Sequence, residues 1–331
     1  MPATIYDVAT HAGVSISTVS RVVNSPQGVN PATRFRVQRS IEALGFVPRA
    51  DATARARRLH RQVGVLAPFF TYSAFVQRLR GIASSLSDAG YELVVYNADT
   101  PEHIHAYLHS LPLLRRLDGL IIISLRLDDM LAVRLRASGL PVALIEATHP
   151  SLSGVDVDNR EGGRVAGKYL MAAGHRQIGF VGGDYAVGDY TLRTSQLRLQ
   201  GLCEVAEAAG VQVQVPALPA NSATREDAQQ QAFELLARSQ PPTAIFAASD
   251  TLALGVLRAA RERNLRVPQD LAVLGFDDLE FAEYIGLSTI SQSLEVSGRQ
   301  AVELVMAAMA DEQTLPRHVQ LPLHVVRRET A

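Results

Sequence analysis

From Val63 onward, short apolar runs alternate with stretches of helical periodicity, and this alternation limits the folds open to the chain. The first series of runs is VGVLAP, ELVVYN, GLIIIS and PVALIE, and the second is QIGFVGG, the weaker VQVQVP, TAIFAAS and LAVLGFDD. Continuous apolar runs of this kind are typical of parallel strands that helices cover on both faces. Two series predict an α/β body of two doubly wound parallel-sheet lobes, with ligands bound beyond the carboxyl ends of the strands.

The residues before this body follow a helical pattern. Apolar positions three and four residues apart predict three short helices, over 5–12, 16–24 and 31–44. Gly13 permits a tight turn between the first two helices, and Asn30-Pro31 is suited to begin the third. We therefore expect an all-α head at the N-terminus.

Composition narrows the class of protein further. The chain has 331 residues, of which 47% are hydrophobic and 20% charged, a balance typical of globular proteins with more than one domain. Its one cysteine, Cys203, excludes an internal disulfide and a cysteine-rich zinc site. No apolar run reaches the roughly 18–20 residues that a membrane span needs, and the N-terminal residues lack the apolar core of a signal peptide. We expect a cytoplasmic protein.

Two other patterns are better explained without a ligand. Gly182-Gly183 could cradle a phosphate, but a turn at the end of a strand is the favoured interpretation, and no GxGxxG or Walker pattern accompanies it. His103, His105 and His109 fall within one predicted helix, where a solvated face is the simpler interpretation. We predict neither a metal nor a cofactor.

Charge is distributed unevenly along the chain. Residues 1–62 carry nine arginines against three carboxylates, a formal excess of six positive charges. The remaining residues carry 23 basic and 30 acidic side chains. A basic head on an acidic body indicates that the head meets a polyanion, the alternative being a solvated basic face with no partner.

The segment TIYDVATHAGVSISTVSRVVN, residues 4–24, has the pattern of a helix–turn–helix. With the basic charge and a third helix it predicts a DNA-binding head, the alternative being a plain three-helix bundle. In this geometry the second helix enters the major groove, which directs three side chains toward base edges: Ile16, Ser17 and Arg21. Short polar or cationic side chains at helix starts and edges are expected to contact phosphates: Thr4, Ser15, Thr18, Ser20, Asn24, Thr33 and Arg34.

Several blocks, taken in order, resemble the lactose/galactose repressor family (LacI/GalR). In the head they are the segment above and NPATRFRVQRSIEALGFVP. In the body they are VDVDNREGGRVAGKYLMAAGHRQIGFVGG, SQLRLQGLCEVAEAAG, AASDTLALGVLRAAR, VPQDLAVLGFDD and LSTISQS. The resemblance covers essentially the whole chain. It implies a ligand-regulated dimeric repressor whose body is a periplasmic-binding-protein-like pair of lobes, and with no heptad pattern after Leu323 we expect a homodimer.

Domain boundaries follow from the pattern and the resemblance together. We expect a helix–turn–helix domain at 1–47, a hinge or linker at 48–62, and the effector-binding and dimerisation body at 63–331. Within the body, the first lobe is expected at about 63–157 and 291–323, and the second at about 158–290.

The linker departs from the family's pattern. Members of the family carry a leucine seven positions after the proline, which wedges into the minor groove, and here that position is Arg55. An arginine can enter a minor groove electrostatically but cannot act as an apolar wedge. We expect Arg55, Arg57 and Arg58 to supply charge to phosphates or the groove, the alternative being a disordered tether.

The effector is expected to meet charged and amide side chains of both lobes. Asp250 follows TAIFAAS at the carboxyl end of a strand, where it could cap the next helix or accept hydrogen bonds from two sugar hydroxyls. The resemblance favours the effector role and adds Arg198 and Glu146, the latter in place of the family's usual aspartate. Gln292 lies in the crossover back to the first lobe. Aromatic side chains at strand ends could stack on a sugar or fill the core: Phe70, Tyr72, Phe75 and Phe276.

These expectations combine into one function. The protein is predicted to be a sequence-specific repressor that a small molecule, most simply a saccharide, releases from a pseudo-palindromic operator. The alternative keeps the DNA-binding role but has a corepressor ligand or a partner protein strengthen operator binding. An enzyme is not expected because no nucleophile–base pair or cofactor fingerprint is present, and a sugar-transport protein would have no use for a basic head.

Overall fold

The structure is a computed structural model that describes residues 3–24, 29–46, 61–68, 70–114, 116–187, 190–217, 224–311 and 313–331. It separates into two compact units. Unit 1 comprises Met1–Phe69, Ile82–Gly154 and Arg299–His318. Unit 2 comprises Phe70–Gly81, Val155–Gly298 and Val319–Ala331. Four segments that the sequence placed in the first lobe therefore fall in unit 2: 70–81, 155–157, 291–298 and 319–323.

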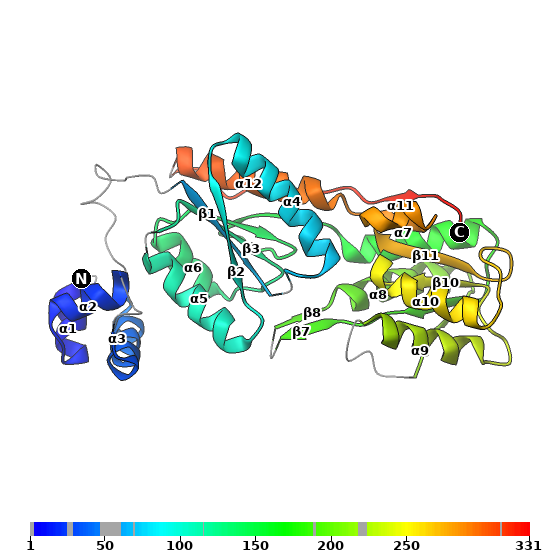
Figure 1. Ribbon diagram of the computed structural model, residues 1–331, viewed down its shortest axis with the longest axis horizontal. Helices are drawn as coiled ribbons and strands as arrows, with labels where there is room; N and C mark the ends of the chain where they lie inside the picture. Colours follow the sequence, from blue (N-terminus) through cyan, green and yellow to red (C-terminus); the bar gives the residue numbers. More distant parts are fainter. Residues whose placement is uncertain are drawn as a thin grey trace. The chain divides into compact units, whose positions relative to one another are not determined.

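The head consists of the three helices that the sequence predicted, α1 (Ile5–Ala12), α2 (Ile16–Asn24) and α3 (Pro31–Leu44) (Figure 1). Local signals set their ends. Thr4 and Asp7 form a reciprocal capping box at the start of α1, and Gly13 ends that helix with φ +62°. These caps leave α2 free to turn away from α1.

The core of the head is small and apolar. The three helices pack together because each contributes buried apolar side chains to this core. These side chains are Val8, Ala9, Ala12, Val19, Val22, Val23, Val37 and Ile41. Leu113, from helix α5 (Pro101–Leu114) of the body, completes the same cluster.

The first sheet has the strand order β13-β5-β4-β3-β1-β2, in which β4, β3, β1 and β2 run parallel to one another. Its strands are β1 (Gln62–Ala67), β2 (Glu92–Asn97), β3 (Gly119–Ile123), β4 (Val142–Ile145), β5 (Ser153–Asp156) and β13 (His318–Gln320). The helices that accompany it are α4 (Ser73–Asp88), α5 (Pro101–Leu114), α6 (Asp129–Ala137) and α12 (Leu294–Ala310). In Figure 1, α4 and α12 lie on one side of β1 and β3, and α5 and α6 on the other.

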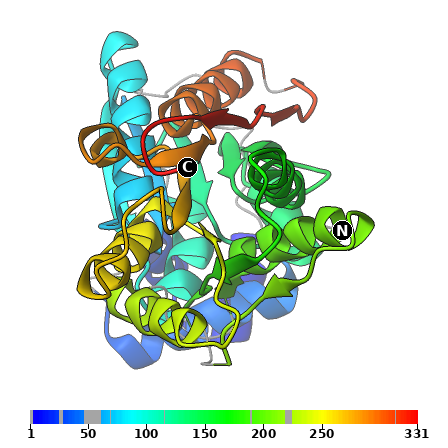
Figure 2. The ribbon, with the colours of Figure 1, turned by 90° about the vertical axis from the view of Figure 1, so that its right-hand side faces the viewer.

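The second sheet has the order β14-β12-β11-β10-β6-β9, parallel except that β14 runs antiparallel to β12. Its strands are β6 (Ile178–Val181), β9 (Val213–Gln214), β10 (Ala244–Ala247), β11 (Ala272–Asp277), β12 (Ser288–Ser291) and β14 (His324–Val326). The helices are α7 (Asn159–Ala172), α8 (Thr194–Ala208), α9 (Arg225–Leu236), α10 (Asp250–Glu262) and α11 (Glu280–Tyr284). Helix α7 packs against α8, and α9 against α10 (Figure 2).

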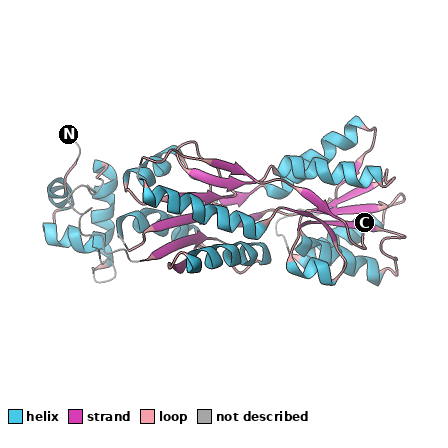
Figure 3. Cartoon of the chain, turned by 90° about the horizontal axis from the view of Figure 1, so that it is seen from above, coloured by secondary structure: helices cyan, strands magenta, loops and turns pink. Residues whose placement is uncertain are grey.

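The prediction of two parallel-sheet α/β lobes with a helical head is confirmed, and Figure 3 shows the strands of each sheet with helices alongside. The structure adds strands that the sequence analysis did not predict, among them the antiparallel hairpin of β7 (Tyr185–Val187) and β8 (Tyr190–Leu192). The weak run VQVQVP forms only the two-residue strand β9. Among the described residues, no helix has the length and apolar character that crossing a membrane requires.

Candidate functional sites

The second helix of the head presents its first residues to solvent. Ile16 is 40% exposed, and Ser17 and Arg21, one helical turn apart, are also exposed. Val19, Val22 and Val23 turn into the core, so the opposite side of α2 is left for contact with a partner. The three side chains predicted to read base edges are thus accessible on one short helix.

The side chains predicted to contact phosphates also hold the helix ends. The Thr4 hydroxyl accepts from the Asp7 amide at 3.4 Å, and the Ser15 hydroxyl accepts from the Thr18 amide at 3.2 Å. Ser20, Thr33 and Arg34 are partly buried. The side chain of Asn24 lies outside the described part of the chain, as do the linker residues Arg55, Arg57 and Arg58.

In unit 2, the guanidinium of Arg198 is the centre of a buried polar group. Its Nε donates to Asn159 Oδ1 at 2.9 Å, and its Nη1 donates to the carbonyl oxygen of Ala248 at 2.5 Å. The guanidinium carbon lies 3.5 Å from the centroid of the Phe276 ring. Helix α7, strand β11 and the residue directly after β10 therefore fix the orientation of this cation, which is only 4% exposed.

Asp277, at the carboxyl end of β11, is a member of this group that the sequence analysis missed. Its Oδ1 lies 3.9 Å from Arg198 Nη1 and accepts from Gln292 Nε2 at 2.5 Å. Gln292 in turn accepts from Arg78 Nη2 at 3.2 Å. The sequence feature that could have identified Asp277 is the pair of aspartates at the end of LAVLGFDD, because ligands are expected at that end of the strand.

The close approach of α7 and α8 sets the position of Arg198. A Cβ on Gly163 would lie 1.9 Å from the Arg198 carbonyl oxygen, and one on Gly201 would lie 1.8 Å from that of Arg160. Only glycine lets the two backbones meet at this distance. The helix that carries Arg198 is thus held against α7 by direct backbone contact.

Asp250, predicted to bind the effector, is fully buried in unit 2. Its Oδ1 accepts from Thr289 Oγ1 at 2.5 Å, and its Oδ2 accepts from the Leu279 amide at 2.7 Å. Burial and then the neighbouring Asp277 carboxylate raise the pKa of Asp250 well above 3.8. The alternative interpretation of Asp250 as a helix cap is wrong, because Ser249 occupies that position and accepts from the Leu252 amide.

Unit 1 has a polar pair of its own at the carboxyl ends of two adjacent strands. Ser124 follows β3 and Glu146 follows β4, and the Ser124 hydroxyl donates to Glu146 Oε2 at 2.5 Å. Both residues have left-handed backbone conformations, with φ +59° and +57°. Glu146 was predicted from the sequence and Ser124 was not, although GLIIIS ends on it.

The four predicted aromatic side chains have different environments. Phe276 is fully buried and Phe75 is 4% exposed, so both contribute to the core. Each also lies beside an arginine, Phe276 under Arg198 and Phe75 with its centroid 5.9 Å from the guanidinium carbon of Arg78. Tyr72 is 44% exposed, and Phe70 is partly buried.

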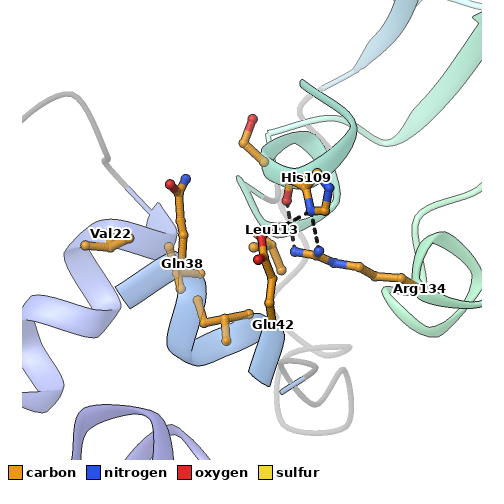
Figure 4. A pocket seen from close by; sticks show the side chains of 9 residues that line it. Val22, Gln38, Glu42, His109, Leu113 and Arg134 are labelled. Carbon is orange, nitrogen blue, oxygen red and sulfur yellow. Dashed lines mark hydrogen bonds and ion pairs between the residues drawn. The ribbon is translucent and has the colours of Figure 1, made fainter. Parts of the chain in front are cut away.

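A small cavity in unit 1 lies between α2 and α3 of the head and α5 and α6 (Figure 4). Arg134 donates to both the Nδ1 and the carbonyl oxygen of His109, and Glu42 lies 3.6 Å from the same Nδ1. Burial and then the Arg134 charge lower the pKa of His109 to about 4. His109 is therefore neutral near pH 7 and accepts a hydrogen bond from Arg134.

No group of three or more His, Cys, Asp or Glu side chains within the described ranges is arranged to hold a metal ion. Burial raises the pKa of the Cys203 thiol, which keeps it protonated and weakly reactive at neutral pH.

Comparison with known proteins identifies the family. Residues 4–49 match the family described as bacterial regulatory proteins, lacI family, and residues 167–331 match a periplasmic binding protein-like domain. The HTH-type transcriptional regulator CelR of Thermobifida fusca is 33% identical over 99% of this chain and 98% of its own.

Two solved structures extend the likeness to the fold. A transcriptional regulator CelR–cellobiose complex has a TM-score of 0.70 and 30% identity, covering 99% of this chain and all of the other. The lac repressor dimer bound to operator and the anti-inducer ONPF has a TM-score of 0.68 and 29% identity, covering 100% and 99%. The family match of the head, the full-length relative and the similar solved structures all indicate the same family. The chain belongs to the LacI family of bacterial regulatory proteins.

Proposed function

We propose that this DNA-binding transcription regulator is a repressor whose homodimer leaves its operator when a saccharide binds in the body. The observation that carries the proposal is the Arg198–Asp277–Gln292 group, which offers a charged donor, a charged acceptor and an amide at the carboxyl edge of a parallel sheet. Sugars are recognised by such sets, because each hydroxyl both donates and accepts. The complex of the related CelR with cellobiose supports a saccharide as the effector.

Direct contact with the effector is assigned to Arg198, Asp277 and Gln292 in unit 2. Asp277 takes the role that the sequence gave to Asp250, because both Asp250 oxygens already accept hydrogen bonds from the protein. Glu146 and Ser124 are assigned to the effector as a second, independent set on unit 1. Release from DNA requires the effector to favour the non-binding state by a coupling free energy of about 1–3 kcal/mol.

The head is assigned to DNA through Ile16, Ser17 and Arg21 at base edges. Two heads of a dimer would read two half-sites related by the two-fold axis of the protein, which predicts a pseudo-palindromic operator. Because the regulator acts on DNA, the proposed site of action of the protein is the cytoplasm.

A second copy of the chain is the proposed partner of the body. Unit 2 has a groove of about 370 Å³ whose lining includes the apolar or aromatic Val76, Phe281 and Tyr284 beside the Arg80–Glu280 ion pair, and Tyr284 is 83% exposed. An exposed aromatic side chain beside a groove, such as Tyr284 here, is typical of protein interfaces. Sedimentation of Tyr284→Asp should show more monomer than the unchanged chain at the same concentration, and an unchanged dimer would exclude this face.

The test of the function has two stages. Thermal unfolding against cellobiose, ribose, other mono- and disaccharides, sugar phosphates and purines identifies compounds that bind the folded chain, because such ligands raise the Tm. Operator binding is then titrated with each hit, using operator fragments selected from random DNA by the protein itself. A sugar that raises the Tm and weakens DNA binding supports the proposal.

The matched variant is Asp277→Asn, which keeps the shape of the side chain but removes its charge. It should show a smaller sugar-dependent rise in Tm, with measurable but weaker sugar binding, while binding the operator as before. A sugar that tightens DNA binding would make the protein corepressor-dependent, and a response only to purines or sugar phosphates would overturn the saccharide assignment.

A further inference from the structure

The buried carboxylate of Asp250 lies directly behind the segment that carries Asp277. It occupies the first turn of α10 and reaches across to β12 through Thr289 and to the residue after Asp278 through the Leu279 amide. A Cβ on Gly275 would lie 2.2 Å from Asp250 Oδ1, so the absent side chain of Gly275 gives the carboxylate its place beside β11. Helix α10 and the strands β11 and β12 thus meet at one side chain.

The segment it holds has an unusual backbone. Asp277 has φ +123° and Asp278 has φ +60°, backbone values that residues other than glycine rarely adopt. Such conformations persist only where surrounding contacts over-determine them. Here the contacts are the Asp250–Leu279 bond on one side, Gln292 on Asp277, and Arg328 Nη2 on Asp278 Oδ1 at 2.7 Å.

We propose that Asp250 is a positioning residue that fixes the Asp277–Asp278 turn, and with it the effector carboxylate, without touching the effector itself. The proposal rests on the function proposed above, because it takes Asp277 as the direct contact. It differs from the sequence-based prediction in what Asp250 does, since its two oxygens bond to Thr289 and Leu279 and not to sugar hydroxyls.

Two substitutions at this position separate the roles. In Asp250→Asn, the amide oxygen can still accept from the Leu279 amide and the amide nitrogen can donate to the Thr289 hydroxyl, so the turn keeps both links. In Asp250→Ala, both links are lost. Titration calorimetry with cellobiose should show the Asn variant within about threefold of the unchanged chain and the Ala variant weakened about tenfold or more. An Asn variant as weak as the Ala variant would overturn the proposal.

A double-mutant cycle tests whether Asp250 acts through Asp277. If it does, Asp250→Ala should weaken cellobiose binding far less in the Asp277→Asn background than in the unchanged chain, because the positioned group is already compromised. Independent contacts would give multiplicative losses, and that result would return Asp250 to the set of direct contacts.

The matched control for general destabilisation is Val256→Ala, which opens a cavity under the same helix α10, where Val256 is fully buried. It should lower the Tm as Asp250→Ala does, yet leave the cellobiose affinity unchanged. An equal loss of affinity in the control would show that loss of stability alone explains the effect.

A readout without effector keeps the two proposals distinct. Hydrogen exchange of the Leu279 amide should be faster in Asp250→Ala and unchanged in Asp250→Asn and Val256→Ala. If no saccharide binds but this exchange pattern holds, the saccharide assignment fails while the positioning role stands. If exchange at Leu279 is the same in all variants, Asp250 does not hold the turn.

Discussion

The guanidinium of Arg198 lies over Phe276 with its central carbon 3.5 Å from the ring centroid, while its nitrogens donate to Asn159 and Ala248. The stack and the two hydrogen bonds use the planar, forked shape of arginine, which lysine does not share. The position of the charge beside Asp277 therefore depends on the kind of cation as well as on its sign.

Arg198→Lys should accordingly behave as a loss of function in the effector site. We expect cellobiose, or the saccharide that binds the unchanged chain, to bind about tenfold to a hundredfold more weakly, in line with the value of a charged hydrogen bond. Operator affinity without sugar should change less than twofold. Calorimetry and fluorescence anisotropy measure the two quantities, and full sugar affinity in the lysine variant would remove Arg198 from the site.

Gly163→Ala should disturb the same site from a distance. Its Cβ would meet the Arg198 carbonyl oxygen, a backbone atom that cannot move without shifting α8. We expect a loss of about 1–3 kcal/mol in the free energy of unfolding, as for other overpacked positions, together with weaker sugar binding. Gly167→Ala is the control, because there the nearest atom is a terminal methyl of Val205. It should cost less stability and leave sugar affinity intact.

Two arginines of the head should respond differently to removal. Arg21→Ala is expected to cost about 1–3 kcal/mol of operator binding and to relax preference at one base position. Arg34→Ala should weaken binding to all sequences alike and reduce the slope of log affinity against log salt by about one. Binding to a set of single-base operator variants at several salt concentrations distinguishes them. Equal loss on all sequences for Arg21→Ala would place that residue on the phosphates.

The linker arginines lie outside the described residues and stay a prediction. If Arg55, Arg57 and Arg58 supply charge to the DNA, Arg55→Leu should flatten the salt dependence of operator binding and sharpen preference at the central base step. An unchanged salt slope with an unchanged central preference would argue against this role.

Stability should fall on mild acidification, and His109 should account for part of the loss. Its pKa is lowered from 6.5 to about 4 in the folded chain, so between these values the unfolded chain binds a proton that the folded chain does not. The free energy of unfolding therefore decreases as pH falls from about 6.5 toward 4. His109→Gln, which can still accept from Arg134, should reduce this slope in urea titrations. His175, whose pKa burial also lowers, leaves a remainder of the same sign.

The head was predictable to the residue because its helix ends are set locally. Thr4, Gly13 and Asn30 act on backbone groups only a few positions away, and each belongs to a residue type with a strong preference for its place. The β7–β8 hairpin was missed, since its short strands carry no apolar run of the kind that marked the sheets.

The effector site was predictable in region but not in detail. Asp250 and Asp277 both follow apolar strands, so sequence alone places both at the ligand edge. Which carboxylate turns inward depends on the space beside Gly275 and on the backbone of Asp277, and both arise only when β10, β11 and β12 are side by side. The contact between Gly163 and Arg198 depends in the same way on a partner helix distant in sequence.

Ser124, Glu146, Asp277 and Asp278 all stand just at or beyond the ends of strands, with positive φ. Glycine, asparagine and aspartate adopt positive φ more readily than other residues, so they are the replacements expected to leave the strands unchanged. Valine, isoleucine and threonine, whose branched Cβ fits poorly there, are disfavoured before any ligand arrives. The backbone thereby restricts which residue types these four positions can carry if the ligand preference changes. The hydrophobic residues of the sheets would not have to change with them.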